Sequence, residues 1–256
     1  MKKKSKQILL ASVVTLTAIG MIICLSFYNG IIWFNNPSPE TYPVRGVDVS
    51  AYQGTIDWEV LSSQNIDFAF IKATEGSSFE DPCFRFNWDR ASQTNLKVGA
   101  YHFFSFDSSG ESQANFFIDT VPITYNSLSP VVDIELYGEK KKNPPDVKTT
   151  QIELAALLTK LESHYHRKPI LYATQKSYDL YLKGKYESHP IWIRDVLTKP
   201  QLPDNREWTF WQYSHREKLK GYDGEETYID MNVFNGTQEE FKNFIQDSSI
   251  KAAENI

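Results

Sequence analysis

The stretch Pro130-Val131-Val132-Asp133-Ile134-Glu135-Leu136 is followed by a long segment with helical periodicity, residues 147–166. The first stretch has the apolar, β-branched composition of a buried strand. Apolar residues of the second recur at spacings of three and four, at Ile152, Ala155, Leu158, Leu161 and Tyr165. A strand followed by such a helix predicts one βα unit of a parallel sheet, with this apolar stripe packed on the outside of the sheet.

The same alternation continues in both directions along the chain. Strands are expected at 44–49, 67–73, 97–104, 130–136, 169–173, 190–193, 209–213 and 228–233, and helices near 58–64, 84–94, 111–121 and 147–166. Connections in the final third are short or contain proline, which predicts a closure made of strands alone. Thr237 and Glu240 form a capping box that predicts a terminal helix. The pattern indicates an α/β protein with an eight-stranded barrel.

The N-terminal residues 1–34 are expected to form a cytoplasmic tip and a transmembrane anchor. Four lysines among residues 2–6 precede residues 8–28, which carry no charged side chain and are long enough to span a hydrocarbon core. We expect a single-pass protein of the cytoplasmic membrane with its main domain outside the cytoplasm. The alternative is secretion after signal cleavage, but the apolar stretch is long for a cleavable signal and continues to Trp33.

The rest of the chain is expected to divide into a Pro-rich linker (35–43), a barrel domain (44–247) and a C-terminal tail (248–256). A hydrophobic fraction of 41% is sufficient for a sizeable core. The net charge is −5, or −9 without the four N-terminal lysines, which argues against a nucleic-acid partner. Cys83 is the only cysteine outside the expected anchor, so the barrel has no internal disulfide to form.

Four carboxylates fall at the expected strand ends where a parallel barrel collects its reacting groups: Asp48, Asp133, Glu135 and Asp230. Asp133 and Glu135 are two residues apart on one strand, so both project to the same face. Two neighbouring carboxylates resist being ionised together, and the more apolar one keeps its proton. One acid and one base held apart in pKa meet the requirement of glycoside hydrolysis.

Two other readings of the carboxylates are open at this point. They can cap a helix or pair with Lys or Arg, and a cluster of them also suits a divalent cation. Aromatic side chains on the expected strands favour a sugar-binding cleft, although core packing is an alternative for each one. Lys72 and Glu75 are expected to form a supporting ion pair, and His102 to be a hydrogen-bonded core residue. The histidines lack metal-ligand spacing, and no cofactor or metal is expected.

A series of short motifs runs along the chain in a fixed order: Arg45-Gly46-Val47-Asp48-Val49-Ser50, Ile71-Lys72-Ala73-Thr74-Glu75-Gly76, Gly99-Ala100-Tyr101-His102-Phe103, Asp133-Ile134-Glu135, Phe210-Trp211-Gln212-Tyr213-Ser214 and Ile229-Asp230-Met231-Asn232-Val233-Phe234. With these motifs the chain resembles the family 25 glycoside hydrolases, the Chalaropsis-type lysozymes. The resemblance extends from Val44 to the terminal helix. It implies an irregular TIM-like (β/α)5(β)3 barrel that hydrolyses the β-1,4 bond from N-acetylmuramic acid to N-acetylglucosamine in peptidoglycan glycan strands.

Carried over by motif, the resemblance implies that Glu135 is the general acid and that Asp133 holds the substrate's 2-acetamido group. Asp48 and Asp230 would be supporting carboxylates. The residues expected to bind substrate are Tyr101, Phe103, Tyr172, Trp192, Trp211 and Gln212. Participation of the acetamido group and direct attack by water are both open as mechanisms.

The chain departs from the family after Trp192, where a small residue and then an aromatic residue or His are usual and Ile193-Arg194-Asp195 stands instead. The departure is expected to affect the neighbouring sugar subsite. One competing function is a non-catalytic peptidoglycan-binding protein on the same barrel, and another is a metal-dependent phosphodiesterase. We expect the protein to be a monomer.

Overall fold

The computed structural model describes residues 2–28, 35–124 and 127–253, and the chain divides into two compact units, Met1–Asn36 and Pro37–Ile256. The first unit contains one helix, α1 (Lys2–Tyr28). Its segment Lys4–Ser26 is long and apolar enough to cross a membrane, a test that an N-terminal signal sequence also passes. The expected boundaries of anchor, linker and tail stay predictions.

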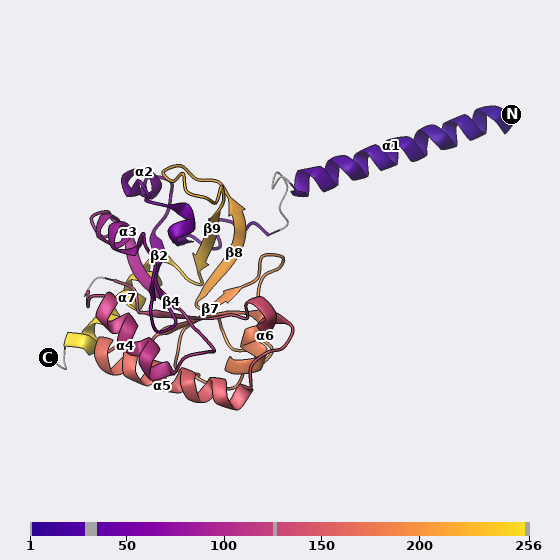
Figure 1. Cartoon of the computed structure of the whole chain (residues 1–256). Coiled ribbons are helices and arrows are strands. Elements are labelled where there is room, and N and C mark those ends of the chain that lie inside the picture. The colour runs from indigo at the N-terminus through magenta and orange to yellow at the C-terminus, as the bar shows by residue number, and fades with distance from the viewer. Residues whose placement is uncertain (1, 29–34, 125–126, 254–256) are drawn as a thin grey trace. The chain divides into compact units, whose positions relative to one another are not determined.

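The second unit is built around a closed barrel of eight strands (Figure 1). The strands are β1 (Arg45–Val49), β2 (Phe68–Glu75), β4 (Lys97–Phe103), β5 (Val131–Ile134), β6 (Ile170–Thr174), β7 (Ile191–Arg194), β8 (Phe210–Glu217) and β9 (Ile229–Phe234). The order around the barrel is β1-β9-β8-β7-β6-β5-β4-β2, and pairing of β1 with β2 closes it. Within the barrel, β9 is antiparallel to its neighbours and the other pairs are parallel. A two-residue strand, β3 (Phe79–Glu80), pairs with β2 at its end.

Helices follow the first five barrel strands and are absent between the last three in the described chain. They are α2 (Trp58–Ser62), α3 (Phe84–Ala91), α4 (Gly110–Thr120), α5 (Val147–Tyr165) and α6 (Gln175–Ser177). This arrangement confirms the expected α/β fold of five βα units closed by three strands. Alpha6 and the π-helical turn that continues it (Tyr178–Leu182) were not predicted, because elements this short show no periodicity.

Aromatic rings fill the barrel interior next to the first residues of β2 and β8. The Phe68 and Phe70 rings lie 5.5 Å apart, and each contacts the ring of Phe210. Gly46 makes room for this layer, because a Cβ atom there would lie 2.4 Å from the Phe68 ring. Helix α7 (Gln238–Ala253) adds Phe241, whose ring centroid is 5.6 Å from that of Phe68. The polar side chains of the interior lie toward the other end of the barrel, at the carboxyl ends of its parallel strands.

The terminal helix begins with the capping box that the sequence predicts. Thr237 N–H donates to Glu240 Oε2 at 2.7 Å, and Glu240 N–H donates to Thr237 Oγ1 at 3.2 Å. The reciprocal bonds satisfy two donors that a helix start leaves without intrahelical partners.

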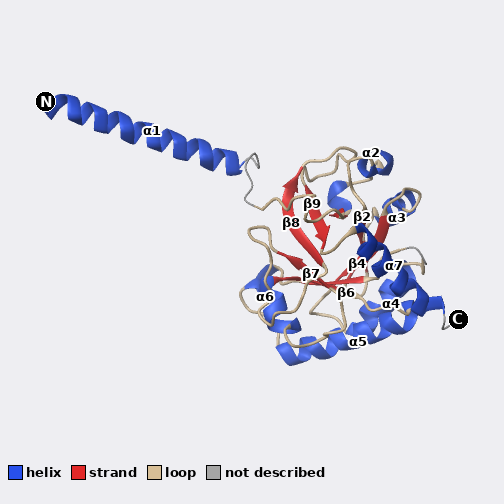
Figure 2. Ribbon diagram, turned by 180° about the vertical axis from the view of Figure 1, so that it is seen from behind, coloured by secondary structure: helices blue, strands red, loops and turns tan. Residues whose placement is uncertain are grey.

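The buried face of α5 differs from the expected stripe. Ile152 is 58% exposed and Ala155 is also exposed, so the stripe was wrong at both positions. The buried residues are Thr150, Leu154, Leu157, Leu158, Leu161 and Tyr165. Helix α5 packs beside α4 as well as on the barrel (Figure 2), and Gly110 N–H of α4 donates to Glu153 Oε2 at 2.7 Å. Contact with a second helix thus rotates the buried face toward Leu154 and Leu157.

Candidate active site

A cleft of about 300 Å³ opens at the carboxyl ends of the barrel strands. All four expected carboxylates line it, together with five of the residues expected to bind substrate: Asp48, Asp133, Glu135, Asp230, Tyr101, Phe103, Tyr172, Trp192 and Gln212. These side chains come from β1, β4, β5, β6, β7, β8 and β9 or from the residue that follows a strand. The barrel closure therefore brings together groups that lie far apart in the sequence.

Trp211 is the one expected substrate-binding residue that is not among those lining the cleft. Successive residues of a strand face opposite sides, and its neighbour Gln212 points inward. Trp211 instead packs against Tyr42 and Trp208, with ring centroids 5.9 and 5.7 Å away, and its Nε1–H donates to the Asp195 carbonyl at 2.7 Å. The structure gives Trp211 a packing role outside the barrel.

Asp48 and Asp230 form one pair of carboxylates, directly opposite each other in the β1–β9 ladder. Gln212 Nε2 donates to Oδ2 of both, at 2.9 and 3.0 Å. Asn232 Nδ2 donates to the same oxygen of Asp48 at 2.8 Å. Burial raises the pKa of Asp48, and burial together with the charge of Asp48 raises the pKa of Asp230 well above its usual value. The pair consequently holds a proton more tightly than two exposed carboxylates would.

Two aromatic residues orient the amide groups that hold this pair. Tyr172 O–H donates to Gln212 Oε1 at 3.0 Å, and Trp192 Nε1–H donates to Asn232 Oδ1 at 2.8 Å. Trp192 is also stacked on the Phe70 ring at 4.5 Å. Because Tyr172 and Trp192 are almost fully buried, they form the floor of the cleft and fix the directions in which the amides donate.

Asp133 and Glu135 form the second pair, on the inner side of β5, while Ile134 between them packs in the outer core. Asp133 is 7% exposed, and its Oδ1 atom is buried without a hydrogen-bond partner among the described residues. Burial and the charge of Glu135 raise the pKa of Asp133 well above its usual value. Burial also raises the pKa of Glu135, against the opposing charges of Arg194 and Lys141. The pair can therefore hold and transfer a proton, as general acid catalysis requires.

Some cleft residues, and the buried Asn232 that donates to Asp48, were missing from the prediction. Asn232 could have been found from strand alternation, because it lies two residues after Asp230 on the same strand. Tyr52 and Gln53 come from a 3-10 turn after β1, and Glu226 comes from the loop before β9. Residues in such connections carry no periodic signal, so the sequence alone does not assign them to the cleft.

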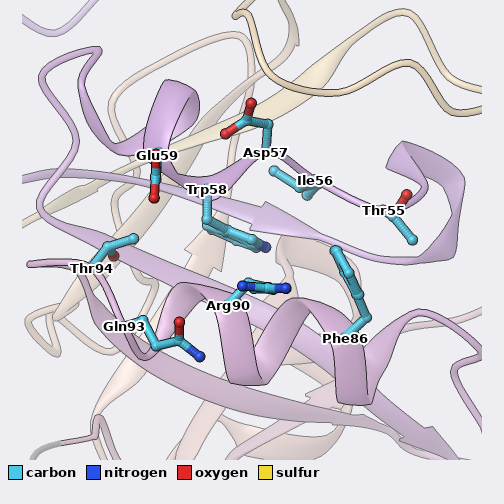
Figure 3. A pocket seen from close by; sticks show the side chains of 9 residues that line it. All are labelled: Thr55, Ile56, Asp57, Trp58, Glu59, Phe86, Arg90, Gln93 and Thr94. Carbon is cyan, nitrogen blue, oxygen red and sulfur yellow. The ribbon is translucent and has the colours of Figure 1, made fainter.

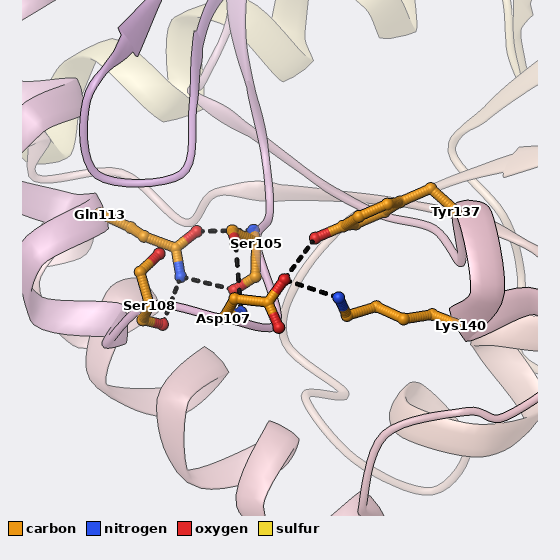
Figure 4. Close-up of polar contacts among 6 residues, drawn as sticks. All are labelled: Ser105, Asp107, Ser108, Gln113, Tyr137 and Lys140. Carbon is orange, nitrogen blue, oxygen red and sulfur yellow. Dashed lines mark hydrogen bonds and ion pairs between the residues drawn. The ribbon is translucent and has the colours of Figure 1, made fainter.

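The chain segment after Glu135 is held by polar contacts to the loop after β4 (Figure 4). Asp107 accepts from Lys140 Nζ at 2.6 Å and from Tyr137 O–H at 3.4 Å. Gln113 fixes the other side of the loop, because its Nε2 donates to the carbonyls of Ser105 and Ser108, both at 2.9 Å. These contacts tie the backbone beside Glu135 to a neighbouring βα unit.

Lys72 and Glu75 form the ion pair predicted from the sequence, with Lys72 Nζ 2.8 Å from Glu75 Oε2. The Lys72 ammonium also lies 5.0 Å from the centroid of the Phe103 ring, and Lys72 lines the cleft. Its positive charge acts against the raised pKa of Asp133. Lys72 thereby limits the cost of burying negative charge in the cleft.

His102 is a hydrogen-bonded core residue, as predicted. Its Nδ1 lies 2.7 Å from Thr74 Oγ1, and its Nε2 lies 2.9 Å from Gln113 Oε1. Gln113 Oε1 has only acceptor capacity, which assigns the ring proton to Nε2 and makes the Thr74 hydroxyl the donor to Nδ1. Burial lowers the pKa of His102 to about 4, so the ring is neutral at pH 7.

A pH-dependent stability difference is expected from this histidine. The unfolded chain binds a proton at His102 near pH 6.5, whereas the folded chain binds it only near pH 4. Between these values protonation favours the unfolded chain, so the free energy of unfolding decreases as the pH falls below 6.5. The shift corresponds to roughly 3 kcal/mol. We expect the free energy of unfolding of wild type, relative to His102→Gln, to decrease between pH 7 and pH 5 in denaturant titrations. A difference that does not change with pH would contradict this assignment.

A second pocket, of about 400 Å³, is lined by residues of α2, α3 and the segments next to them (Figure 3). Its carboxylates are exposed, and Asp57 already accepts from Val60 N–H as the N-cap of α2. Trp58 is almost fully buried and donates to Asn87 Oδ1 at 3.2 Å. Asp57 and Trp58 are thus engaged in the fold, and the cleft that brings four carboxylates together is the candidate active site.

Comparisons with known proteins identify the family to which the chain is similar. Residues 47–222 match the family model described as glycosyl hydrolases family 25. The chain is similar to a solved family 25 glycosyl hydrolase from Bacillus anthracis, with 55% identity, a TM-score of 0.78 and coverage of 82% of this chain and 96% of the other. For a solved bacterial lysozyme from Streptomyces coelicolor the values are 28%, 0.70, 80% and 98%. Lysozyme M1 of Streptomyces globisporus is 31% identical over 209 residues, 77% of this chain and 70% of that protein.

Proposed function

The chain belongs to glycosyl hydrolase family 25, and from this membership we propose that its cleft cleaves the β-1,4 bond from N-acetylmuramic acid to N-acetylglucosamine. The protein is a glycoside hydrolase of the lysozyme type, a peptidoglycan hydrolase. The observation that carries the proposal is the geometry of one cleft, which Asp133 of β5 and Glu135 directly after it share with the opposed pair Asp48 and Asp230.

In the proposed reaction, Glu135 donates its proton to the oxygen of the leaving sugar. Its raised pKa supports this role, because a general acid must be protonated at the working pH. Positive charge develops on the sugar ring as the bond breaks, and nearby carboxylates stabilise it. The nucleophile that attacks the anomeric carbon is either the 2-acetamido group of the substrate or a water molecule, and Asp133 assists it in both cases. Asp48 and Asp230 support the same site from the opposite wall.

The two competing functions lack comparable support. A non-catalytic glycan-binding protein on this barrel would not need an acid pair with raised pKa values, and both members of the pair are present. A metal-dependent phosphodiesterase would need a ligand cluster, and the described residues contain no group of three or more His, Cys, Asp or Glu side chains placed to hold a metal ion.

The proposed bond specificity is tested by the chemistry of the new reducing ends. We expect the full chain in detergent to digest purified peptidoglycan, and borohydride reduction followed by mass spectrometry to find reduced muramic acid at the new ends. Detergent alone is the blank, and a chelator is expected to leave the rate unchanged. Reduced glucosamine ends would contradict the proposed bond, and loss of activity on chelation would favour the metal-dependent alternative.

We further propose that α1 keeps the enzyme in the cytoplasmic membrane, with a monomeric barrel outside the cytoplasm. The lysines at its start and the length of its apolar segment support this orientation. A tethered enzyme acts within the reach of its linker, which suits local remodelling of the wall. Cell fractionation is expected to recover the protein with membranes, and recovery of most of it from the culture medium would favour secretion after cleavage.

A further inference from the structure

Arg194 is the last residue of β7, the strand that contributes Trp192 to the cleft. It is two residues after Trp192, which lines the cleft, so its side chain leaves the strand on the same inner face. In the neighbouring strands it is paired with Thr174 of β6 and Gln212 of β8. Gln212 belongs to the carboxylate network. The side chain of Arg194 therefore leaves the barrel strand beside the catalytic cleft.

The charge of Arg194 acts on the cleft without being used in an ion pair. It lowers the pKa values of Asp48, Glu135 and Asp230, and it also lowers the pKa of His215. Within the described ranges, Arg194 has no hydrogen bond or salt bridge, and it is only half-buried. An arginine that is near three carboxylates but bound to none of them has its planar set of donors available to a ligand.

A second cation, Lys141, lies near Glu135. Lys141 opposes the raised pKa of Glu135, and its ammonium group forms no ion pair in the described chain. The Lys141 carbonyl accepts from Lys176 Nζ at 2.6 Å, which adds another positive charge to this rim. The cleft, which is lined by five carboxylates and Lys72, thus has further cations near Glu135, and a substrate that bears a carboxylate would meet complementary charge there.

This inference rests on the proposed function and refines its substrate. N-acetylglucosamine is neutral, whereas the muramic acid unit carries a lactyl group whose carboxyl is free or joined to a stem peptide with carboxylates of its own. We propose that Arg194 is a substrate-specificity residue whose guanidinium binds a carboxylate of the muramic acid unit or of its stem peptide. Arginine binds carboxylates through two parallel hydrogen bonds, which gives orientation as well as affinity.

The test compares wild type, Arg194→Gln and Arg194→Lys as full chains in detergent on two substrates. One is peptidoglycan with its stem peptides, and the other is glycan from which an amidase has removed the stems, leaving free lactyl carboxylates. Each is also used after its carboxylates have been converted to methylamides. Lys148→Gln, on the exposed surface of α5, controls for the loss of one positive charge.

We expect Arg194→Gln to raise KM roughly tenfold on the substrate that carries the bound carboxylate, with kcat changed by less than about twofold. The effect should vanish on the methylamides, be partly restored by Arg194→Lys and be absent in Lys148→Gln. An increase only on stem-bearing peptidoglycan assigns the stem carboxylate, and an increase only on the stripped glycan assigns the lactyl carboxylate.

Two outcomes would overturn the inference. One is that neither Arg194 variant changes KM relative to wild type, or that both change it equally on charged and methylamidated substrates. The other is a lower kcat with a shifted pH profile and unchanged KM, which would mean that Arg194 acts only through the proton affinity of Glu135. If wild type cleaves no form of peptidoglycan, the proposed function itself fails, and this result is distinct from both.

Discussion

Replacing Glu135 by glutamine is expected to lower kcat for peptidoglycan hydrolysis by roughly 10³-fold, the typical contribution of a general acid. Glutamine keeps the shape of the side chain and its place after β5, but it has no acidic proton to give to the leaving oxygen. KM should change little, because the residues that form the floor and walls of the cleft are retained. The measurement is the rate of reducing-end formation by full-length wild type and variant.

The control variant is Glu139→Gln, which makes the same change at an exposed residue close in the chain. Glu139 is paired with Lys142 at 3.5 Å on the surface and is expected to be dispensable for catalysis. A muramyl substrate with an aryl leaving group of low pKa needs little proton donation, so the loss caused by Glu135→Gln should be much smaller on it. If the variant retains more than a tenth of the wild-type kcat on peptidoglycan, another group is the acid.

The pH profile gives an independent check on the same residue. Activity that needs protonated Glu135 is lost as the pH rises through its pKa, and burial raises that pKa, so the alkaline limb lies above the range of an ordinary glutamate. The residual activity of Glu135→Gln should lack this limb. A limb that persists in the variant would assign it to a different group, such as the pair formed by Asp48 and Asp230.

Much of the barrel could be predicted because its strands and longer helices repeat the periods of regular structure. Each of the eight expected strands corresponds to a barrel strand, with ends that differ by a few residues. The face that a helix buries was harder, because Ile152 of α5 satisfies the periodicity and is nevertheless exposed. Periodicity fixes which residues share a face, but the packing of α4 beside α5 decides how far that face is turned.

The candidate site shows the same division between local and non-local information. Asp133 and Glu135 could be placed on one face from strand alternation alone, and the same rule excludes Trp211 once Gln212 is assigned to the interior. The link from Gln212 to Asp48 and Asp230 could not be derived this way. It depends on the register of β1 against β9 and of β8 against β9, which is set by barrel closure and not by any one segment.

Replacing Asp133 by asparagine is expected to lower kcat by roughly 10²-fold while making the folded protein more stable at neutral pH. The folded-state pKa of Asp133 lies well above its unfolded value, so this group favours folding at low pH and opposes it as the pH rises through the folded pKa. Asparagine removes that opposition. Thermal unfolding at pH 7 should therefore show a higher midpoint for the variant, together with the lower rate.

The opposite signs of these two effects separate a catalytic role from a structural one. A residue needed only for folding would lose stability and activity together, whereas Asp133 places a buried Oδ1 without a partner in the cleft, available to a donor from the substrate. An acetamido N–H is such a donor. If the acetamido group attacks the anomeric carbon, the fresh product has the β configuration, and a trifluoroacetylated substrate should react more slowly. If NMR finds the α anomer first, water attacks directly, and Asp133 is its general base.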